Sequence, residues 1–226
     1  MFESVVFIGP SLKREMAMKL LGTETNILPP VKRGDLPNLD SNVKLIGIID
    51  GVFFEEAAVG HREIVDKIRA GVKIFGGSSM GALRAYELKS FGMIGIGKIY
   101  QMYVQRELEG DDEVALIFDP ETYEPLSEPL VNLRYNLELA VEKNILNWSQ
   151  KNKIIEKLKD VYYPKRNKET MFQYAKKILD EKTVHRLKTM FNQNYVDLKE
   201  KDAIDVINAL KSVRKNVNNN HRRYNK

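Results

Sequence analysis

The chain has 226 residues, a formal net charge of +5 and 43% hydrophobic residues, which is enough for one domain with an addition or two small domains. It contains no cysteine, and this excludes disulfides, thiolate metal sites, a cysteine nucleophile and a persulfide carried on this protein. No run approaches the roughly 18 apolar residues of a membrane span, and no basic segment precedes a long apolar stretch, so we expect a cytoplasmic protein.

The first part of the chain alternates strand patterns with helix patterns. Apolar and β-branched runs predict strands at 5–9, 43–50 and 72–77, and a further strand at 113–119. Apolar residues at helical spacing predict helices at 10–21, 61–71 and 80–92, and a segment rich in turn formers predicts a loop at 26–39. Strands that alternate with helices indicate an α/β fold with a mainly parallel, Rossmann/flavodoxin-like sheet flanked by helices.

From about Val131 the pattern becomes almost entirely helical, with helices expected near 131–145, 149–161, 167–181 and 198–214. We therefore divide the chain into an α/β domain (1–130), a helical C-terminal region (131–216) and a polar, flexible tail (217–226). The segment from Lys151 onward carries a surplus of 11 positive charges, and the preceding part carries a surplus of six negative ones. Its acids and apolar stripes are intermixed, which favours solvated helix faces or a protein-docking surface over nucleic-acid binding.

The segment Gly77-Ser78-Ser79-Met80-Gly81 fits the pattern G-x-S-x-G between a predicted strand and a predicted helix. A nucleophile elbow has this context, with a serine on a sharp turn and the following amide, here that of Met80, as oxyanion donor. One alternative is that Ser78 or Ser79 caps the helix. Another is a phosphate-binding loop, although no Walker lysine follows the glycines.

A serine nucleophile needs a base, and His61 is the one histidine in the α/β part. If the strands that end near Asp50 and Gly77 are neighbours, then Asp50, His61 and Ser79 gather at one sheet edge. Glu55 and Glu63 are further carboxylates within reach. The simpler interpretation of His61 is an exposed residue in the first turn of a helix. The simpler interpretation of Asp50 is an Asp-Gly turn after a strand.

Four cationic side chains are candidates for binding an anionic group. Arg62 and Arg84 lie on predicted helices, while Lys32 and Arg33 lie on a proline-stiffened loop that can form an anion site or a lid. Each is also explained by ordinary solvation or ion pairing. The acidic segment 109–113 has enough carboxylates for a divalent ion, but acidic turns are common, so we expect no metal and no cofactor.

Several long strings together resemble the TfuA-like family: "GPS" (9–11), "ILPPVKRGDL", "IIDGVFFEEAAVGHREI", "GGSSMGALRAYEL", "FGMIGIG" and "EGDDEVALIFDPETYEPLSEPLVN". The likeness covers about residues 1–140, and the helical remainder adds nothing to it. Ser11 belongs to the first of these strings and joins the substrate-binding candidates.

The resemblance implies an accessory protein of YcaO enzymes, which use ATP to convert backbone amides of peptides into thioamides. In methanogenic archaea the pair is linked to glycine thioamidation in the alpha subunit of methyl-coenzyme M reductase. The implied partners are therefore a YcaO-type enzyme, a sulfur donor or carrier protein and, through YcaO, a peptide substrate; we expect no membrane partner.

Without cysteine the chain cannot deliver sulfur as a persulfide. Our hypothesis is that Ser79, with His61 or a carboxylate as base, attacks a thiocarboxylate or similar acyl–sulfur bond and frees sulfide beside YcaO. The alternative is a noncatalytic partner that docks or activates YcaO. A general serine hydrolase unconnected to sulfur is a third possibility.

Overall fold

The computed structural model describes residues 3–53 and 57–224, and the chain folds into two compact units. Unit 1 comprises residues 1–111 and 199–226, and unit 2 comprises residues 112–198. Within the described residues, no helix is both long and apolar enough to cross a membrane.

Unit 1 contains a five-stranded, all-parallel sheet, which confirms the predicted α/β, Rossmann-like fold. The strand order is β2-β1-β3-β4-β5, the order of flavodoxin-like folds. The strands are β1 (Glu3–Phe7), β2 (Thr25–Leu28), β3 (Val43–Ile48), β4 (Lys73–Gly77) and β5 (Ile94–Ile96).

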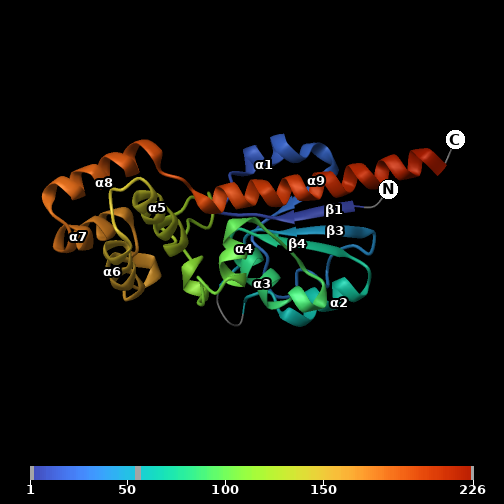
Figure 1. The fold of residues 1–226 in the computed structure, drawn as a ribbon. Helices are drawn as coiled ribbons and strands as arrows, with labels where there is room; N and C mark the ends of the chain where they lie inside the picture. Colours follow the sequence, from blue (N-terminus) through green and yellow to red (C-terminus); the bar gives the residue numbers. More distant parts are fainter. Residues whose placement is uncertain (1–2, 54–56, 225–226) are drawn as a thin grey trace. The chain divides into compact units, whose positions relative to one another are not determined.

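Helices cover both faces of this sheet. Helices α1 and α9 lie on one face, and α2, α3 and α4 lie on the other (Figure 1). Their bounds are α1 (Arg14–Leu21), α2 (His61–Arg69), α3 (Met80–Glu87), α4 (Gly97–Val104) and α9 (Leu198–Tyr224), with short 3₁₀ turns η1 (Gly22–Glu24), η2 (Lys89–Phe91) and η3 (Asp111–Glu113). Because both faces are covered, the strands are apolar runs, and four consecutive residues of β3, from Leu45 to Ile48, are buried.

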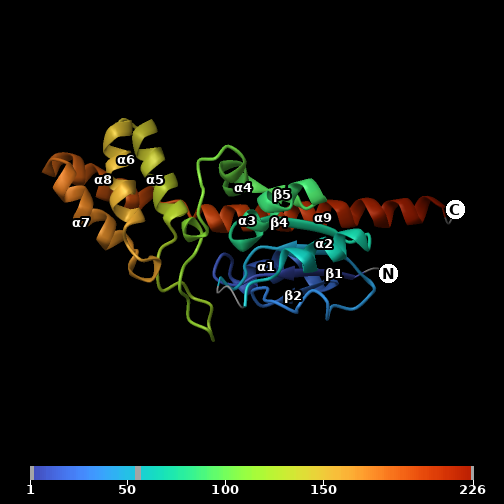
Figure 2. The same ribbon diagram turned by 90° about the horizontal axis from the view of Figure 1, so that it is seen from below.

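Unit 2 is helical and has its own hydrophobic core, built from fifteen buried side chains. Its helices are α5 (Leu130–Glu142), α6 (Trp148–Lys159), α7 (Lys168–Ile178) and α8 (Glu181–Asn194), with a 3₁₀ turn η4 (Tyr163–Lys165) (Figure 2). The side chains of Asn147, Asn167 and Asp180 accept the N3 amides of α6, α7 and α8, which explains where these helices begin.

The structure differs from the prediction in several elements. Residues 113–119 form no strand of the described sheet; Phe118 makes one isolated antiparallel bridge with Pro125. Strand β2 lies mostly in the segment predicted as loop, and it ends directly before Pro29 and Pro30. Strand β5 and helices α4 and α8 were not predicted.

Helix α9 departs from the predicted grouping of residues 131–216. Its apolar side chains Ala203, Val206, Ile207 and Leu210 pack with the sheet of unit 1 rather than with α5–α8. The helix also continues to Tyr224, through most of the segment that we expected to be a flexible tail.

Candidate functional site

The serine turn, residues 77–81, connects β4 to α3 at the carboxyl edge of the sheet. The Ser79 amide donates to the Gly77 carbonyl at 2.9 Å, and Ser78 between them has a φ of 67°. This is a γ-turn with positive φ, the rarer and more strained form of that turn. The connection from β4 to α3 is therefore strained, and the positive φ lies at Ser78, one residue before Ser79.

The glycines of the pattern are explained by close packing. A Cβ on Gly81 would lie 1.8 Å from the Ile48 carbonyl oxygen, and a Cβ on Gly77 would lie 2.6 Å from that of Ile96. The Gly81 amide also donates to the Ile49 carbonyl at 3.2 Å. The amino end of α3 is thus pressed against the end of β3, and only glycine fits there.

The two serines of the turn have different surroundings. Ser78 is fully buried, and its hydroxyl donates to the Lys199 carbonyl at 2.8 Å. Ser79 is the N-cap residue of α3, but its side chain makes no capping bond, and its hydroxyl has no hydrogen bond to any residue that the structure describes. Neither serine therefore caps α3 through its side chain, and the Ser79 hydroxyl is left available, although the residue is only 1% exposed.

The amide that would stabilise an oxyanion belongs to Met80, the first residue of α3. The first amides of a helix have no intrahelical acceptor. Here Gly81 donates to Ile49 and Ala82 donates to the Ser79 carbonyl. Within the part of the chain that the structure describes, the Met80 amide therefore stays available at the amino end of this helix.

Asp50 lies two residues beyond the end of β3 and is buried. One carboxylate oxygen accepts the amides of Gly9 (2.8 Å) and Ser11 (3.1 Å), and the other accepts the Ser11 hydroxyl at 2.6 Å. Asp50 and Ser11 are therefore brought together, and Asp50 clamps the loop between β1 and α1. Across residues 3–53 and 57–224, no hydrogen bond joins Asp50 to His61 or Ser79.

His61 begins α2, and its carboxylate partner is Glu87 rather than Asp50. Its Nε2 lies 2.7 Å from Glu87 Oε2, which also accepts Arg84 Nη1 at 2.6 Å. Arg84 Nε donates to the Val59 carbonyl at 3.2 Å. Glu87 lies eight residues beyond Ser79 on α3, about 12 Å along the helix, so the structure pairs His61 with the far end of α3.

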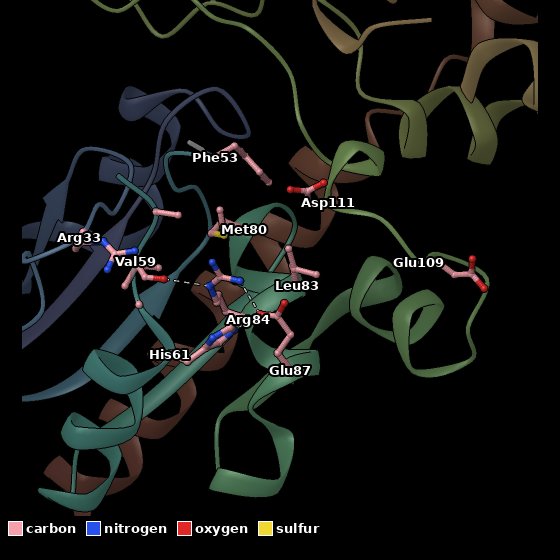
Figure 3. Close-up of a pocket in the computed structure, with 12 residues that line it drawn as sticks. Arg33, Phe53, Val59, His61, Met80, Leu83, Arg84, Glu87, Glu109 and Asp111 are labelled. Atoms are coloured by element: carbon pink, nitrogen blue, oxygen red, sulfur yellow. Dashed lines mark hydrogen bonds and ion pairs between the residues drawn. The ribbon is translucent and has the colours of Figure 1, made fainter. Parts of the chain in front are cut away.

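This cluster lies in a cavity of about 560 Å³ (Figure 3). Arg84 lies between Val59 and Glu87, with His61 beside Glu87 and with Met80 nearby. Neither Ser79 nor Asp50 lines this cavity. The lining residues are Arg33, Phe53, Ala58, Val59, Gly60, His61, Met80, Leu83, Arg84, Glu87, Glu109 and Asp111.

The basic loop is attached to α2. Gly34 donates its amide to Glu63, and the same carboxylate accepts the Gly60 amide, so Glu63 is occupied by holding the loop. Arg33 lines the cavity, whereas the Lys32 amide donates to Asp35 and the Lys32 side chain is exposed.

The remaining candidates are less informative. Arg62 is 94% exposed, lies 3.6 Å from Asp66 and lines a second cavity of about 530 Å³ that also includes Arg33. Glu55 lies outside the described residues. The acidic segment 109–113 contributes to no group of three or more metal-binding side chains within the described chain.

Three residues of this region, Glu87, Lys199 and Asp202, were not predicted from the sequence. Glu87 follows Arg84 by three residues on a predicted helix, a spacing that indicates an ion pair. No local pattern marks the other two, because α9 reaches the serine turn only in the folded protein.

A comparison with protein-family models matches residues 50–167 to the model described as TfuA-like protein, which is more than half of the chain. The chain belongs to the TfuA-like family. This confirms the resemblance. The matched segment includes the serine turn, Asp50, His61 and Glu87 of this TfuA-like protein. A search of curated proteins finds no match.

Proposed function

We propose that this TfuA-like protein is an accessory protein of YcaO-dependent thioamidation and that it frees sulfide from an acyl–sulfur donor at Ser79. Family membership supports the association with thioamidation. The observation that carries the finer proposal is the serine turn. Its backbone is strained at Ser78, its Ser79 hydroxyl lacks a capping bond, and the Met80 amide begins the next helix.

The proposed reaction is an acyl transfer followed by hydrolysis. Ser79 Oγ attacks the acyl carbon of the donor and forms an ester, the carbon–sulfur bond breaks, and sulfide leaves. The hydroxyl proton passes to a base, and water then hydrolyses the ester to a carboxylate and restores the serine. The Met80 amide stabilises the oxyanion of both tetrahedral intermediates.

Two groups are candidates for the base. Asp50 lies at the carboxyl edge of β3, next to the strand that carries the serine turn, but accepts three hydrogen bonds. His61 lines the cavity that reaches Met80 but is hydrogen-bonded to Glu87. The rate of sulfide release by His61→Ala separates the two. Loss of release with retained fold assigns His61, and retention assigns Asp50.

A thiocarboxylate is anionic and resists nucleophilic attack unless its charge is offset. Arg33 and Arg84 line the cavity, and Arg84 is held on two sides by Val59 and Glu87. A guanidinium that is already oriented binds a carboxylate-like group with little loss of entropy. Met80, which follows Ser79, lines the same cavity, so we propose that these two arginines offset the negative charge of the donor from this side.

Thioamide formation by a purified YcaO partner tests the proposal. The reaction contains ATP and peptide and either free sulfide or a carrier-bound sulfur donor, with product measured by intact mass. Wild type, Ser79→Ala and no added protein are compared. We expect Ser79→Ala to support thioamidation with free sulfide but not with the carrier-bound donor. Full activity of a folded Ser79→Ala with the carrier would rule the serine mechanism out.

The second candidate function is a noncatalytic partner that docks or activates YcaO. It is favoured by one observation, namely that His61 is bonded to Glu87 about 12 Å along α3 from Ser79. In this case free sulfide does not bypass the protein. Omission then abolishes thioamidation with both donors, and Ser79→Ala supports both as well as wild type does.

A further inference from the structure

The strain of the serine turn is located at one residue, Ser78. A non-glycine residue with positive φ costs free energy and persists only where its surroundings hold it. Ser78 has a φ of 67°, is fully buried and donates its hydroxyl to the carbonyl of Lys199. The acceptor is 121 residues away in sequence, on the first turn of α9.

The start of α9 is itself fixed at the same edge of the sheet. The carboxylate of Asp202 accepts the amides of Lys98 (3.0 Å) and Ile99 (2.7 Å) at the amino end of α4. A Cβ on Gly97 would lie 2.4 Å from the Asp202 carboxylate, so the two segments are in close contact.

One turn further along, α9 also touches the strand that enters the serine turn. A Cβ on Gly77 would lie 2.6 Å from Val206 Cγ2. Val206 and Ala203 belong to the apolar core that α9 shares with the sheet. The carbonyl of Lys199 is therefore carried by a helix that is anchored both to the amino end of α4 and to the strand that enters the serine turn.

We propose that Ser78 is a positioning residue: its hydrogen bond to the Lys199 carbonyl keeps the strained turn that presents Ser79 and the Met80 amide. This inference rests on the proposed function of Ser79. The two adjacent serines therefore have different roles. Ser79 touches the substrate, whereas Ser78 holds the backbone and never reacts.

The physical reason is a balance between strain and one buried hydrogen bond. Without the hydroxyl, an alanine at position 78 retains the cost of positive φ and loses the contact that offsets it, so the turn relaxes. Glycine adopts positive φ at no steric cost, so it loses the contact without the strain. Ser78→Gly is therefore expected to keep the turn better than Ser78→Ala.

The test measures kcat and KM for sulfide release by wild type, Ser78→Ala, Ser78→Gly and Ser79→Ala. Ser4→Ala is the matched control, because Ser4 is also a buried serine whose hydroxyl donates to a main-chain carbonyl, that of Glu24. We expect kcat of Ser78→Ala to fall about tenfold to a hundredfold with KM unchanged, because a small misplacement of a catalytic group has that effect. Ser78→Gly should recover part of the loss, and Ser4→Ala should keep the wild-type kcat.

A second readout does not depend on activity. Hydrogen exchange of the amides of residues 78–82 should be faster in Ser78→Ala than in wild type, with Ser78→Gly in between. Wild-type kcat and exchange in Ser78→Ala would overturn the positioning role. Equal inactivity of Ser78→Ala and Ser78→Gly beside an active Ser79→Ala would make Ser78 the nucleophile and overturn it as well.

Failure of the proposed function has a different signature. If wild type releases no sulfide, or Ser79→Ala releases it at the wild-type rate while Ser78→Ala still shows faster exchange, the serine mechanism is wrong. The hydrogen bond then holds a turn that has another purpose.

Discussion

The role of Asp50 does not follow from its residue type and its position at the carboxyl edge of the sheet. The sequence places Asp50 after a strand and predicts that it gathers with His61 and Ser79 at one sheet edge. In the structure both carboxylate oxygens of Asp50 are occupied by the β1–α1 loop through Gly9 and Ser11. Buried carboxylates that accept several hydrogen bonds hold the main chain in place, so Asp50 stabilises the fold at this edge.

Asp50→Asn is therefore expected to destabilise the protein. An asparagine retains one acceptor oxygen and turns an NH₂ group toward donors, which should lower the free energy of unfolding by about 2–4 kcal/mol. Urea unfolding measures the change. Asp66→Asn is the control, since Asp66 is exposed, and it should change stability by less than about 0.5 kcal/mol. Equal effects of the two substitutions would contradict the clamp.

Among the elements, α3 is positioned by the absence of a side chain at Gly81. The helix begins against the end of β3, with the Gly81 amide donating to Ile49 and its Cα facing the Ile48 carbonyl. This close approach fixes the positions of Ser79 and Met80 relative to the end of β3.

Gly81→Ala should therefore destabilise the protein by about 3 kcal/mol, because the added methyl group meets backbone that cannot move aside. Gly60→Ala is the comparison, since its Cβ would meet the end of the flexible Glu63 side chain at 3.2 Å. We expect it to cost less than about 1 kcal/mol. Thermal unfolding of both variants checks the difference, and a stable Gly81→Ala protein would refute the close approach.

Helix α9 contributes a titratable group to the same region. Burial raises the pKa of Asp202 to about 6, although the amides of Ile99 and Lys98 that it accepts act in the opposite direction. Between pH 4 and pH 6 the folded protein keeps a proton on Asp202 that the unfolded chain has already lost. Its contribution to stability is therefore largest at low pH and falls as the pH rises to 6.

The stability difference between wild type and Asp202→Asn isolates this effect. We expect the difference to fall by about 2–3 kcal/mol from pH 4 to pH 7, because each pKa unit corresponds to about 1.4 kcal/mol. Urea unfolding at several pH values measures it. A difference that stays constant with pH would mean that folding does not shift the pKa of Asp202, and one that rises with pH would mean that folding lowers this pKa; either would contradict the raised pKa.

The sequence predicts those helices and strands that have a hydrophobic pattern within their own residues. β1, β3 and β4 are apolar runs, and α2, α3 and α5 have clear helical periodicity, so all six were predicted. β5 has three residues, Ile94 to Ile96, with a glycine in the middle, and β2 runs into two prolines. Such short strands exist because neighbouring strands pair with them, and no local pattern carries that information.

At the scale of the whole molecule, the two units have separate cores. Fifteen buried side chains form the core of α5–α8, whereas α9 packs with the sheet of unit 1. The sequence could not separate α9 from the preceding helices. An apolar stripe shows that a helix packs against other elements, but it does not show which elements these are.

Separate cores predict separate effects of core substitutions. Leu187→Ala should destabilise unit 2 by about 2–5 kcal/mol, and Leu45→Ala should do the same for unit 1. Both side chains are almost fully buried, each in a different core. Hydrogen exchange should therefore quicken in α5–α8 for the first variant and in the sheet and α9 for the second. Uniform acceleration across the chain by either variant would contradict two cores.

The candidate site was predicted in part. A strand, glycines, serines and a helix in succession indicate the turn around Ser79 from local sequence alone. The partner of His61 depends on which way two side chains point from α2 and α3, and Glu87 was missed for that reason. The bond from Ser78 to Lys199 spans 121 residues, so only the folded protein shows it.

The most direct measurement is the mass of the covalent intermediate at the serine turn. The protein is mixed with an acyl–sulfur donor, quenched in acid during the first turnover and digested with trypsin, which releases the peptide 74–84 with both serines. We predict an acyl adduct on Ser79 that is absent from Ser79→Ala and stays on Ser79 in Ser78→Ala. Sulfide release without an adduct, or an adduct on Ser78, would contradict the serine mechanism.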